Sequence, residues 1–242
     1  MIPIFQKEIN AFFGSLVAYI VMAVFLTVVG LLVWVFPDTS ILNYGYADLG
    51  SFFSLTPFVL LFLIPAILMR SFAEEVKNGT IELLLTKPVS NWALISGKFL
   101  ANWVLVILTL LPTLLYYYTI YQLGNPIGNI DSAAVAGSYV GLLLLAGVFV
   151  AVGLWTSSLS DNQIVAFVLG VFISYLLYAG IGAIAKFDFW GVWAYPLAWL
   201  SLDAQYDALG RGLIDWRNVM YLVSVGAVFI LLNKISMINH RK

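Results

Sequence analysis

Residues 132–160, SAAVAGSYVGLLLLAGVFVAVGLWTSSLS, carry no charged side chain between Asp131 and Asp161. A helix of this length crosses the roughly 30 Å of hydrocarbon in a bilayer, because each helical residue adds about 1.5 Å. The run is apolar on all sides and does not alternate with period two, so it favours a transmembrane helix over a barrel strand. The sequence therefore predicts a membrane-spanning helix at this position.

Five other runs share this character. They lie between Glu8 and Asp38, Asp48 and Arg70, Lys98 and Asp131, Asp161 and Lys186, and Arg217 and Lys234. The last run is short, but the Lys234 side chain can reach the interface and so extend it. The 242 residues are 62% hydrophobic and 10% charged, with a mean hydropathy of +1.00, far outside the range of soluble proteins. We predict an all-α polytopic membrane protein in which residues 1–242 form a single domain with six transmembrane helices.

The basic residues are divided unevenly between the two sides of such a bundle. With both termini inside, the inner segments hold Lys7, Arg70, Lys77, Lys87, Lys98, Lys234, Arg241 and Lys242, and the outer segments hold Lys186, Arg211 and Arg217. An excess of lysine and arginine marks the cytoplasmic side. We therefore predict cytoplasmic termini and a cytoplasmic segment at residues 70–98. The first run is too long for a signal peptide, so we expect it to remain as a signal anchor.

The first 14 residues have an amphipathic pattern. Phe5, Ile9 and Phe12 recur at helical spacing, and polar residues occupy the rest of the helical circumference. This pattern predicts a short helix at residues 1–14 that lies in the inner interface of the bilayer. The alternative is a polar beginning to the first transmembrane helix, and the spacing alone does not separate the two.

Residues 186–217 form the largest outer segment and are rich in aromatic side chains. These are Trp190, Trp193, Tyr195, Trp199 and Trp216. Such side chains favour the headgroup level of a membrane. The apolar part of the segment is too short to cross and is interrupted by Pro196. We predict a re-entrant or interfacial outer hairpin, with an aromatic belt around a surface loop as the alternative. A GxxxG sequence at Gly137–Gly141 indicates close helix packing, although such matches are common in apolar sequence.

The chain lacks the residues that several function classes require. Its charged residues fall at the ends of runs or in loops, which disfavours a proton-coupled carrier but leaves a sodium-coupled one open. The single histidine, His240, lies in the tail, and we find no HExxH sequence, metal-ligand cluster or phosphate-binding P-loop. Cysteine is absent, and a net charge of −1 without a basic, aromatic-rich stretch disfavours nucleic-acid binding. We predict no catalytic, cofactor or metal site, so any ATP must be bound by another chain.

A polar passage, RSFAEEVKNGTIELLLTKPVSNWALISGK at residues 70–98, separates the second and third runs. Asn78 and Gly79 are suited to end a helix that begins in the second span, with Gly79 in the left-handed conformation. Thr80 is suited to cap a new short helix. The first turn of that helix contains Glu82, where the helix dipole favours a negative charge.

The short helix has a clear end and an apolar flank. Pro88 stops it, and Ser90 or Asn91 can cap the helix that enters the third span. Leu83–Leu85 give it an apolar side among charged neighbours. Such a segment either lies against the membrane or docks into a groove on a cytoplasmic partner, and composition does not choose between them.

This passage resembles the cytoplasmic segment between the second and third spans of type-2 ABC transporter permeases. Those proteins commonly show the pattern GT-x-E-x-L-L-x-x-P-v-s, which is matched here by Gly79, Thr80, Glu82, Leu84, Leu85, Pro88, Val89 and Ser90. The amphipathic beginning, the six spans and the aromatic hairpin agree as well, so the resemblance covers nearly the whole chain. In overall likeness, without a diagnostic motif, the chain is most similar to the permease subunit of the gliding-motility-associated ABC transporter.

The resemblance implies a coupling helix that rests on a cytoplasmic ATP-binding subunit and transmits its closure to the spans. It also implies a second permease chain, the same or related, in the inner membrane of a bacterium, and ATP-driven export. By this carry-over, coupling residues are expected at Glu74, Glu75, Gly79, Thr80, Glu82 and Pro88. None of them is catalytic, and capping alone would account for Gly79, Thr80 and Pro88.

Two other function classes remain open from the sequence. One is a passive membrane scaffold that anchors an envelope machine without moving a substrate. The other is an ion-coupled secondary carrier. Both would show six spans, so topology does not separate them from a permease, whereas the response of a partner's ATPase does.

Overall fold

The computed structural model describes residues 1–43, 45–77, 79, 90–212 and 215–239. Within these residues the chain is almost entirely helical and contains no strand, which confirms the all-α prediction. Six segments of the described chain are long and apolar enough to cross a membrane: Val17–Val35, Gly50–Lys77, Asn91–Leu123, Ser132–Leu159, Gln163–Ala185 and Trp216–Ile238. Each corresponds to one of the six uncharged runs.

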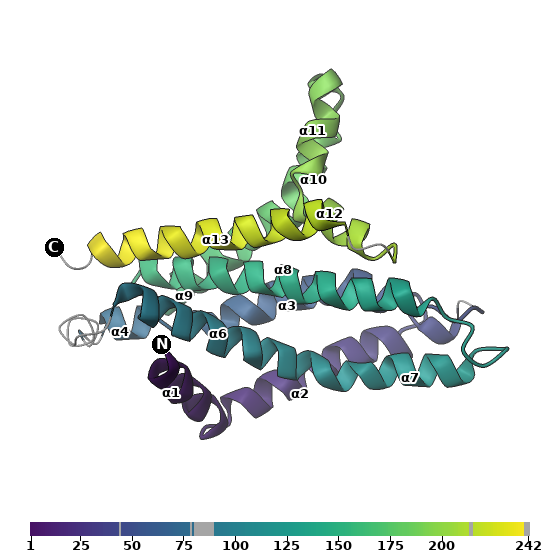
Figure 1. The fold of residues 1–242 in the computed structure, drawn as a ribbon, viewed down its shortest axis with the longest axis horizontal. Helices are drawn as coiled ribbons and strands as arrows, with labels where there is room; N and C mark the ends of the chain where they lie inside the picture. Colours follow the sequence, from purple (N-terminus) through teal and green to yellow (C-terminus); the bar gives the residue numbers. More distant parts are fainter. Residues whose placement is uncertain (44, 78, 80–89, 213–214, 240–242) are drawn as a thin grey trace.

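The helices follow one another with short connections. The α-helices are α1 (Ile2–Phe13), α2 (Val17–Gly30), α3 (Gly50–Leu68), α4 (Ala73–Lys77), α6 (Asn91–Leu110), α7 (Leu114–Leu123), α8 (Ser132–Leu159), α9 (Gln163–Tyr175), α10 (Ile181–Ala185), α11 (Ala194–Trp199), α12 (Leu202–Leu209) and α13 (Trp216–Asn239). Shorter helical turns are η1 (Leu31–Val35), η2 (Ile41–Asn43), η3 (Leu111–Thr113), η4 (Leu176–Gly180) and η5 (Asp188–Trp193). The long helices run along a common axis (Figure 1).

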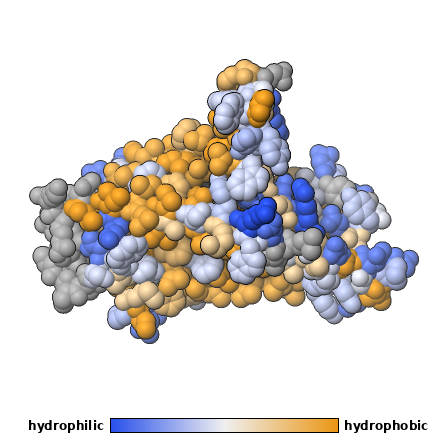
Figure 2. Space-filling model, turned by 45° about the horizontal axis from the view of Figure 1, so that its top comes forward, coloured by the Kyte–Doolittle hydropathy of each residue, from blue (hydrophilic) through white to orange (hydrophobic). Residues whose placement is uncertain are grey.

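Helix α8 is the centre of the bundle. Helices α3, α9, α12 and α13 all pack against it, and 72% of its most apolar stretch is buried, compared with 22% for α2 and for α13. Hydrophobic residues cover most of the bundle's flank in Figure 2, and hydrophilic residues gather toward its ends and near the base of the projecting arm. The arrangement fits a bundle whose flanks face lipid.

Two glycines let α12 approach α8 closely. A Cβ atom at Gly137 would overlap the carbonyl oxygen of Leu209, and one at Gly141 would lie 3.1 Å from the ring of Tyr206. The close packing predicted from GxxxG is therefore confirmed. Its partner, however, is the short helix α12 and not another span.

Helix α1 is separated from α2 by a break at Gly14–Leu16. It packs against the beginning of α6 and against α2, and none of its residues is fully buried. Figure 1 shows α1 at the same end of the bundle as α4 and the last described residues of α13. Helix α1 is therefore not a continuous extension of the first span, and its place in the membrane interface stays a prediction.

The aromatic outer segment divides into two parts. Helices α10 and α11, joined by η5, form an arm that projects sideways from the bundle (Figure 1), and its exposed aromatic side chains include Phe187, Phe189 and Tyr195. Helix α12 instead packs on α8 and α13. The re-entrant or interfacial outer hairpin at 186–217 stays a prediction, and within it residues 202–209 pack on the bundle. Leu202 and Leu209 are seven residues apart and so lie on the same face of α12, and that face is buried in the bundle.

Side-chain hydrogen bonds hold the base of the arm. Ser201 Oγ donates to the carbonyl of Tyr178 at 2.5 Å, and Gln205 Nε2 donates to the carbonyl of Trp199 at 2.6 Å. The Tyr221 hydroxyl donates to the Leu200 carbonyl at 2.6 Å. The carbonyls of Trp199 and Leu200 lie at the end of α11, where they lack partners within the helix, and the Ser201 bond ties the same place to η4.

Candidate coupling site

Helix α6 begins where the polar passage ends. Ser90 Oγ accepts a hydrogen bond from the N–H of Ala93 at 3.2 Å, so Ser90 is the N-cap that the sequence offered with Asn91. The second turn of α6 contains Gly97 and Lys98. A Cβ atom at Gly97 would lie 3.0 Å from Ile4, so glycine at this position allows α1 to lie close against α6.

Lys98 joins the helices at this end of the bundle. Its side chain is buried, with 2% of the residue exposed. The ammonium donates to the Ser71 carbonyl at 2.7 Å and to Glu75 Oε1 at 2.9 Å, and it forms an ion pair with Glu8 Oε1 at 3.2 Å. It also lies 4.8 Å from the ring centroid of Phe72. The three oxygen partners match the three N–H donors of an ammonium, as a buried charge requires.

We call Glu8, Glu75 and Lys98 the Lys98 cluster. Through it, α6 is connected to α1 and to α4, the helix near the beginning of the polar passage. Helix α4 lies near one end of that passage, and the first two turns of α6 form its other end. The cluster therefore holds the two ends of the passage together, although they are far apart in sequence.

Ser157 of α8 holds the turn between α3 and α4. Its Oγ accepts hydrogen bonds from the N–H groups of Phe72 at 3.0 Å and Ala73 at 3.2 Å, and it donates to the Met69 carbonyl at 3.3 Å. Helix α3 ends at Leu68, which corrects the prediction of a helix that continues from the second span to Asn78. The Ser157 hydroxyl stabilises the break because it binds amide groups that the turn leaves without helical partners.

We expect Ser157→Ala to lower the free energy of unfolding by about 1–2 kcal/mol, because two buried N–H groups lose their acceptor. Thermal denaturation of the purified protein in detergent measures the effect. Thr156→Val is the matched control, since Thr156 is also buried on α8 but donates only to the Gly153 carbonyl of its own helix. An equal loss in both variants would show that the turn does not depend on Ser157.

The structure describes three of the six predicted coupling residues. Glu75 lies in the Lys98 cluster, and Glu74 is exposed beside it on α4. Gly79 has φ +66°, which confirms the left-handed conformation, and its N–H donates to the Val76 carbonyl at 3.1 Å. Thr80, Glu82 and Pro88, and with them the short coupling helix, lie outside the described residues.

The sequence patterns do not predict Lys98, Glu8 and Ser157 as members of this site. In the sequence, Lys98 marks the beginning of an uncharged run and adds to the excess of basic residues on the inner side, whereas the structure places it in the second turn of α6 and inside the protein. A signal was present, because a lysine followed by a long uncharged stretch needs a carboxylate partner when it is buried. Nothing comparable distinguishes Ser157 from the other serines of α8.

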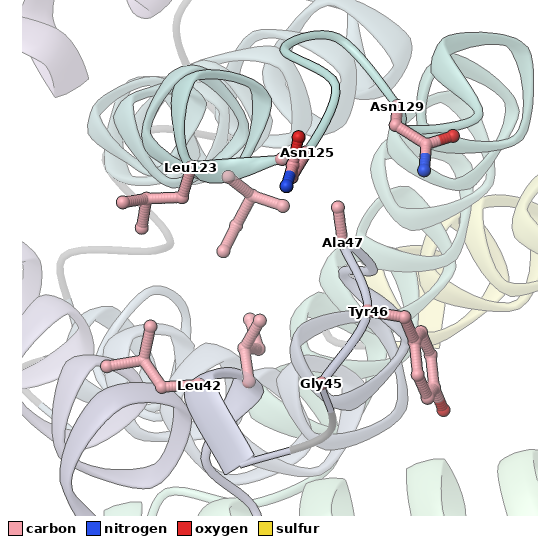
Figure 3. A pocket seen from close by; sticks show the side chains of 10 residues that line it. Leu42, Gly45, Tyr46, Ala47, Leu123, Asn125 and Asn129 are labelled. Carbon is pink, nitrogen blue, oxygen red and sulfur yellow. The ribbon is translucent and has the colours of Figure 1, made fainter.

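A cavity of about 290 Å³ lies at the opposite end of the bundle, between residues 41–43 and 45–47 and the end of α7. Figure 3 shows Leu42 and Leu123 on opposite sides of it, with Asn125 on the α7 side. None of its described lining residues is charged. Within the described part of the chain, no group of three or more His, Asp or Glu side chains is placed to hold a metal ion.

A family model described as ABC-2 family transporter protein matches residues 35–233. The match begins at the end of the first span and includes α4, α6 and the polar passage between them. The chain belongs to the ABC-2 transporter family. No curated protein matched the chain. As an ABC-2 family member, it is a multi-pass membrane permease of an ABC transporter and a transport subunit that is not itself catalytic.

Within this ABC-2 permease, the Lys98 cluster lies inside the matched range except for Glu8, which precedes it. In a typical ABC transporter, a member of this family works with an ATP-binding partner. The polar passage and its two flanks are thus a candidate coupling site.

Proposed function

We propose that this ABC-2 permease pairs with a second permease chain and with a cytoplasmic ATP-binding subunit, and that residues 70–98 couple ATP hydrolysis to export. Both termini lie on the cytoplasmic side of a bacterial inner membrane. Glu74, Glu75, Gly79, Thr80, Glu82 and Pro88 are the proposed coupling residues. The likeness to gliding-motility-associated permeases supports a role in that machinery.

The observation that carries this proposal is the Lys98 cluster. A displacement of the passage by a partner acts on α4 and on the beginning of α6. Glu75 and Lys98 join these two helices to each other, and Glu8 joins them to α1. Because Ser157 holds the preceding turn on α8, the same displacement also reaches the central helix. Coupling requires contacts that differ between two states, and a segment connected to four helices provides such contacts.

The test is affinity purification of the tagged chain from its native host in mild detergent, with identification of the copurifying proteins. We expect an ATP-binding subunit to copurify. In the variant Glu82→Ala/Pro88→Ala, we expect the permease-stimulated ATP hydrolysis of this subunit to fall at least about fivefold. A fivefold change corresponds to the lower end of typical coupling free energies. Pro37→Ala/Asp38→Ala is the matched control, since it removes an exposed proline and an exposed acid from the opposite end of the bundle.

Other outcomes would support the other function classes. A stable complex whose partners hydrolyse no ATP would indicate a scaffold. Ion-dependent flux in liposomes that contain the chain alone would indicate a secondary carrier. A copurifying ATPase that responds equally to both double variants would place coupling outside residues 80–89.

A further inference from the structure

A second cavity, of about 400 Å³, lies beside the Lys98 cluster, between α1, α3, α4 and α6. Its charged lining residues are Lys7, Glu8, Arg70, Glu74, Glu75 and Lys98. Three cationic groups thus face three carboxylates, so the lining is electrically balanced. Phe12 and Ile67 add an apolar side. A cavity that is charged on one side and apolar on the other, next to an amphipathic helix, has the character of a lipid-water boundary.

Asn102 lines this cavity and has an unused acceptor. Only 3% of the residue is exposed. Its Nδ2 donates to the Lys98 carbonyl at 2.8 Å, which fixes the orientation of the amide. Its Oδ1 accepts no hydrogen bond from any residue that the structure describes. A buried acceptor without a donor is unfavourable, so the site favours a ligand that brings an N–H or O–H group.

We propose that this cavity binds the headgroup of a zwitterionic phospholipid that carries a primary ammonium group, such as phosphatidylethanolamine. The ammonium donates to Asn102 Oδ1 and to the carboxylates of the lining. The phosphate faces the exposed cations Lys7 and Arg70, and the acyl chains follow the apolar side at Phe12 and Ile67.

The chemistry of the lining distinguishes this ligand from other lipids. A choline headgroup has the same net charge but no N–H donor, so it leaves Asn102 Oδ1 unpaired. An anionic headgroup such as phosphatidylglycerol adds a net negative charge to a lining that is already balanced, with three carboxylates in it. The proposal does not depend on ATP-driven transport, because the cavity is lined by residues of this chain alone.

The test uses dioleoyl lipids that differ only in methylation of the amine. The purified protein in detergent is mixed with phosphatidylethanolamine, its N-methyl and N,N-dimethyl forms, or phosphatidylcholine, and bound lipid and Tm are measured. Dioleoyl phosphatidylglycerol is measured separately as the anionic comparison. We expect the rise in Tm to decline along this series. In an equal mixture of the two lipids, bound phosphatidylethanolamine should exceed bound phosphatidylcholine by about tenfold. This ratio corresponds to a Kd about ten times lower for phosphatidylethanolamine.

Three variants separate the site from general effects of lipid. Asn102→Leu should lose the preference for phosphatidylethanolamine while its Tm without lipid stays at or above that of the wild type. Thr109→Val, on the same helix and equally buried, should keep the preference, because its hydroxyl already donates to the Leu105 carbonyl. Arg70→Gln, at an exposed position, should weaken binding of the whole lipid series without changing the order within it.

Some results would overturn the proposal. Equal binding of the ethanolamine and choline lipids by the wild type would mean that no N–H group of the headgroup donates to Asn102 Oδ1. Equal stabilisation by phosphatidylglycerol would remove the ammonium from the recognition. An unchanged preference in Asn102→Leu would place the lipid elsewhere.

Discussion

Lys98→Met is expected to lower the free energy of unfolding by about 3–5 kcal/mol, because it leaves two partly buried carboxylates without their cation. Glu8 and Glu75 both bond to this ammonium, and methionine offers no N–H to either. The Ser71 carbonyl loses a donor as well. Thermal or chemical denaturation of the purified protein in detergent measures the loss.

Two further variants identify the cause. Lys234→Met removes a half-buried lysine whose ammonium lies 4.6 Å from the ring centroid of Trp92. This variant should lower the free energy of unfolding by less than about 1 kcal/mol. In the background of Lys98→Met, the change Glu75→Gln should recover part of the stability because it removes one unpaired carboxylate. If Lys98→Met lowered the free energy of unfolding no more than Lys234→Met does, the Lys98 cluster would not hold the helices together.

Gly137→Ala is expected to lower the free energy of unfolding by about 3 kcal/mol, at the upper end of overpacking effects. The added methyl group would overlap the backbone carbonyl of Leu209. A backbone carbonyl does not rotate away as a side chain does, so α12 must separate from α8 or the variant must accept strain. The same denaturation assay detects this.

Gly226→Ala is the control for the change from glycine to alanine within a transmembrane helix. The nearest atom to its added Cβ is a methyl group of Val148 at 3.9 Å, an ordinary contact. Alanine favours helix more than glycine does, so this variant should be unchanged or up to about 1 kcal/mol more stable. A similar destabilisation in both variants would trace the effect to lipid or detergent packing and not to α12.

The spans were predictable because membrane crossing depends on length and polarity, which are local properties of the sequence. The uncharged run at 132–160 corresponds to α8 almost residue for residue. The packing of the aromatic segment's second part on α8 was not predictable in the same way. Composition marks residues 186–217 as interfacial, but the burial of Tyr206 and Leu209 depends on the space that Gly137 and Gly141 leave on α8. That space is a property of two helices together.

The candidate site shows the same division. The left-handed Gly79 and the capping Ser90 follow from local backbone chemistry, and both predictions are confirmed. Glu75 was named because the passage resembles a family motif, and its bond to Lys98 was not foreseen. The ion pairs of the Lys98 cluster join residues from three helices, and no spacing rule relates them. For Thr80, Glu82 and Pro88, the predicted roles stay predictions.

The Lys98 cluster also sets an order of events during synthesis. Glu8 precedes its partner by 90 residues along the chain. At about 5–20 residues per second, the ribosome needs roughly 5–20 s to add that length. Throughout this time Glu8 has no Lys98 to pair with, while the residues of the first two spans are added to the chain. The ion pair between α1 and α6 therefore cannot form before residue 98 is made, so the earliest part of the nascent chain reaches its final position only after the second span has been synthesised.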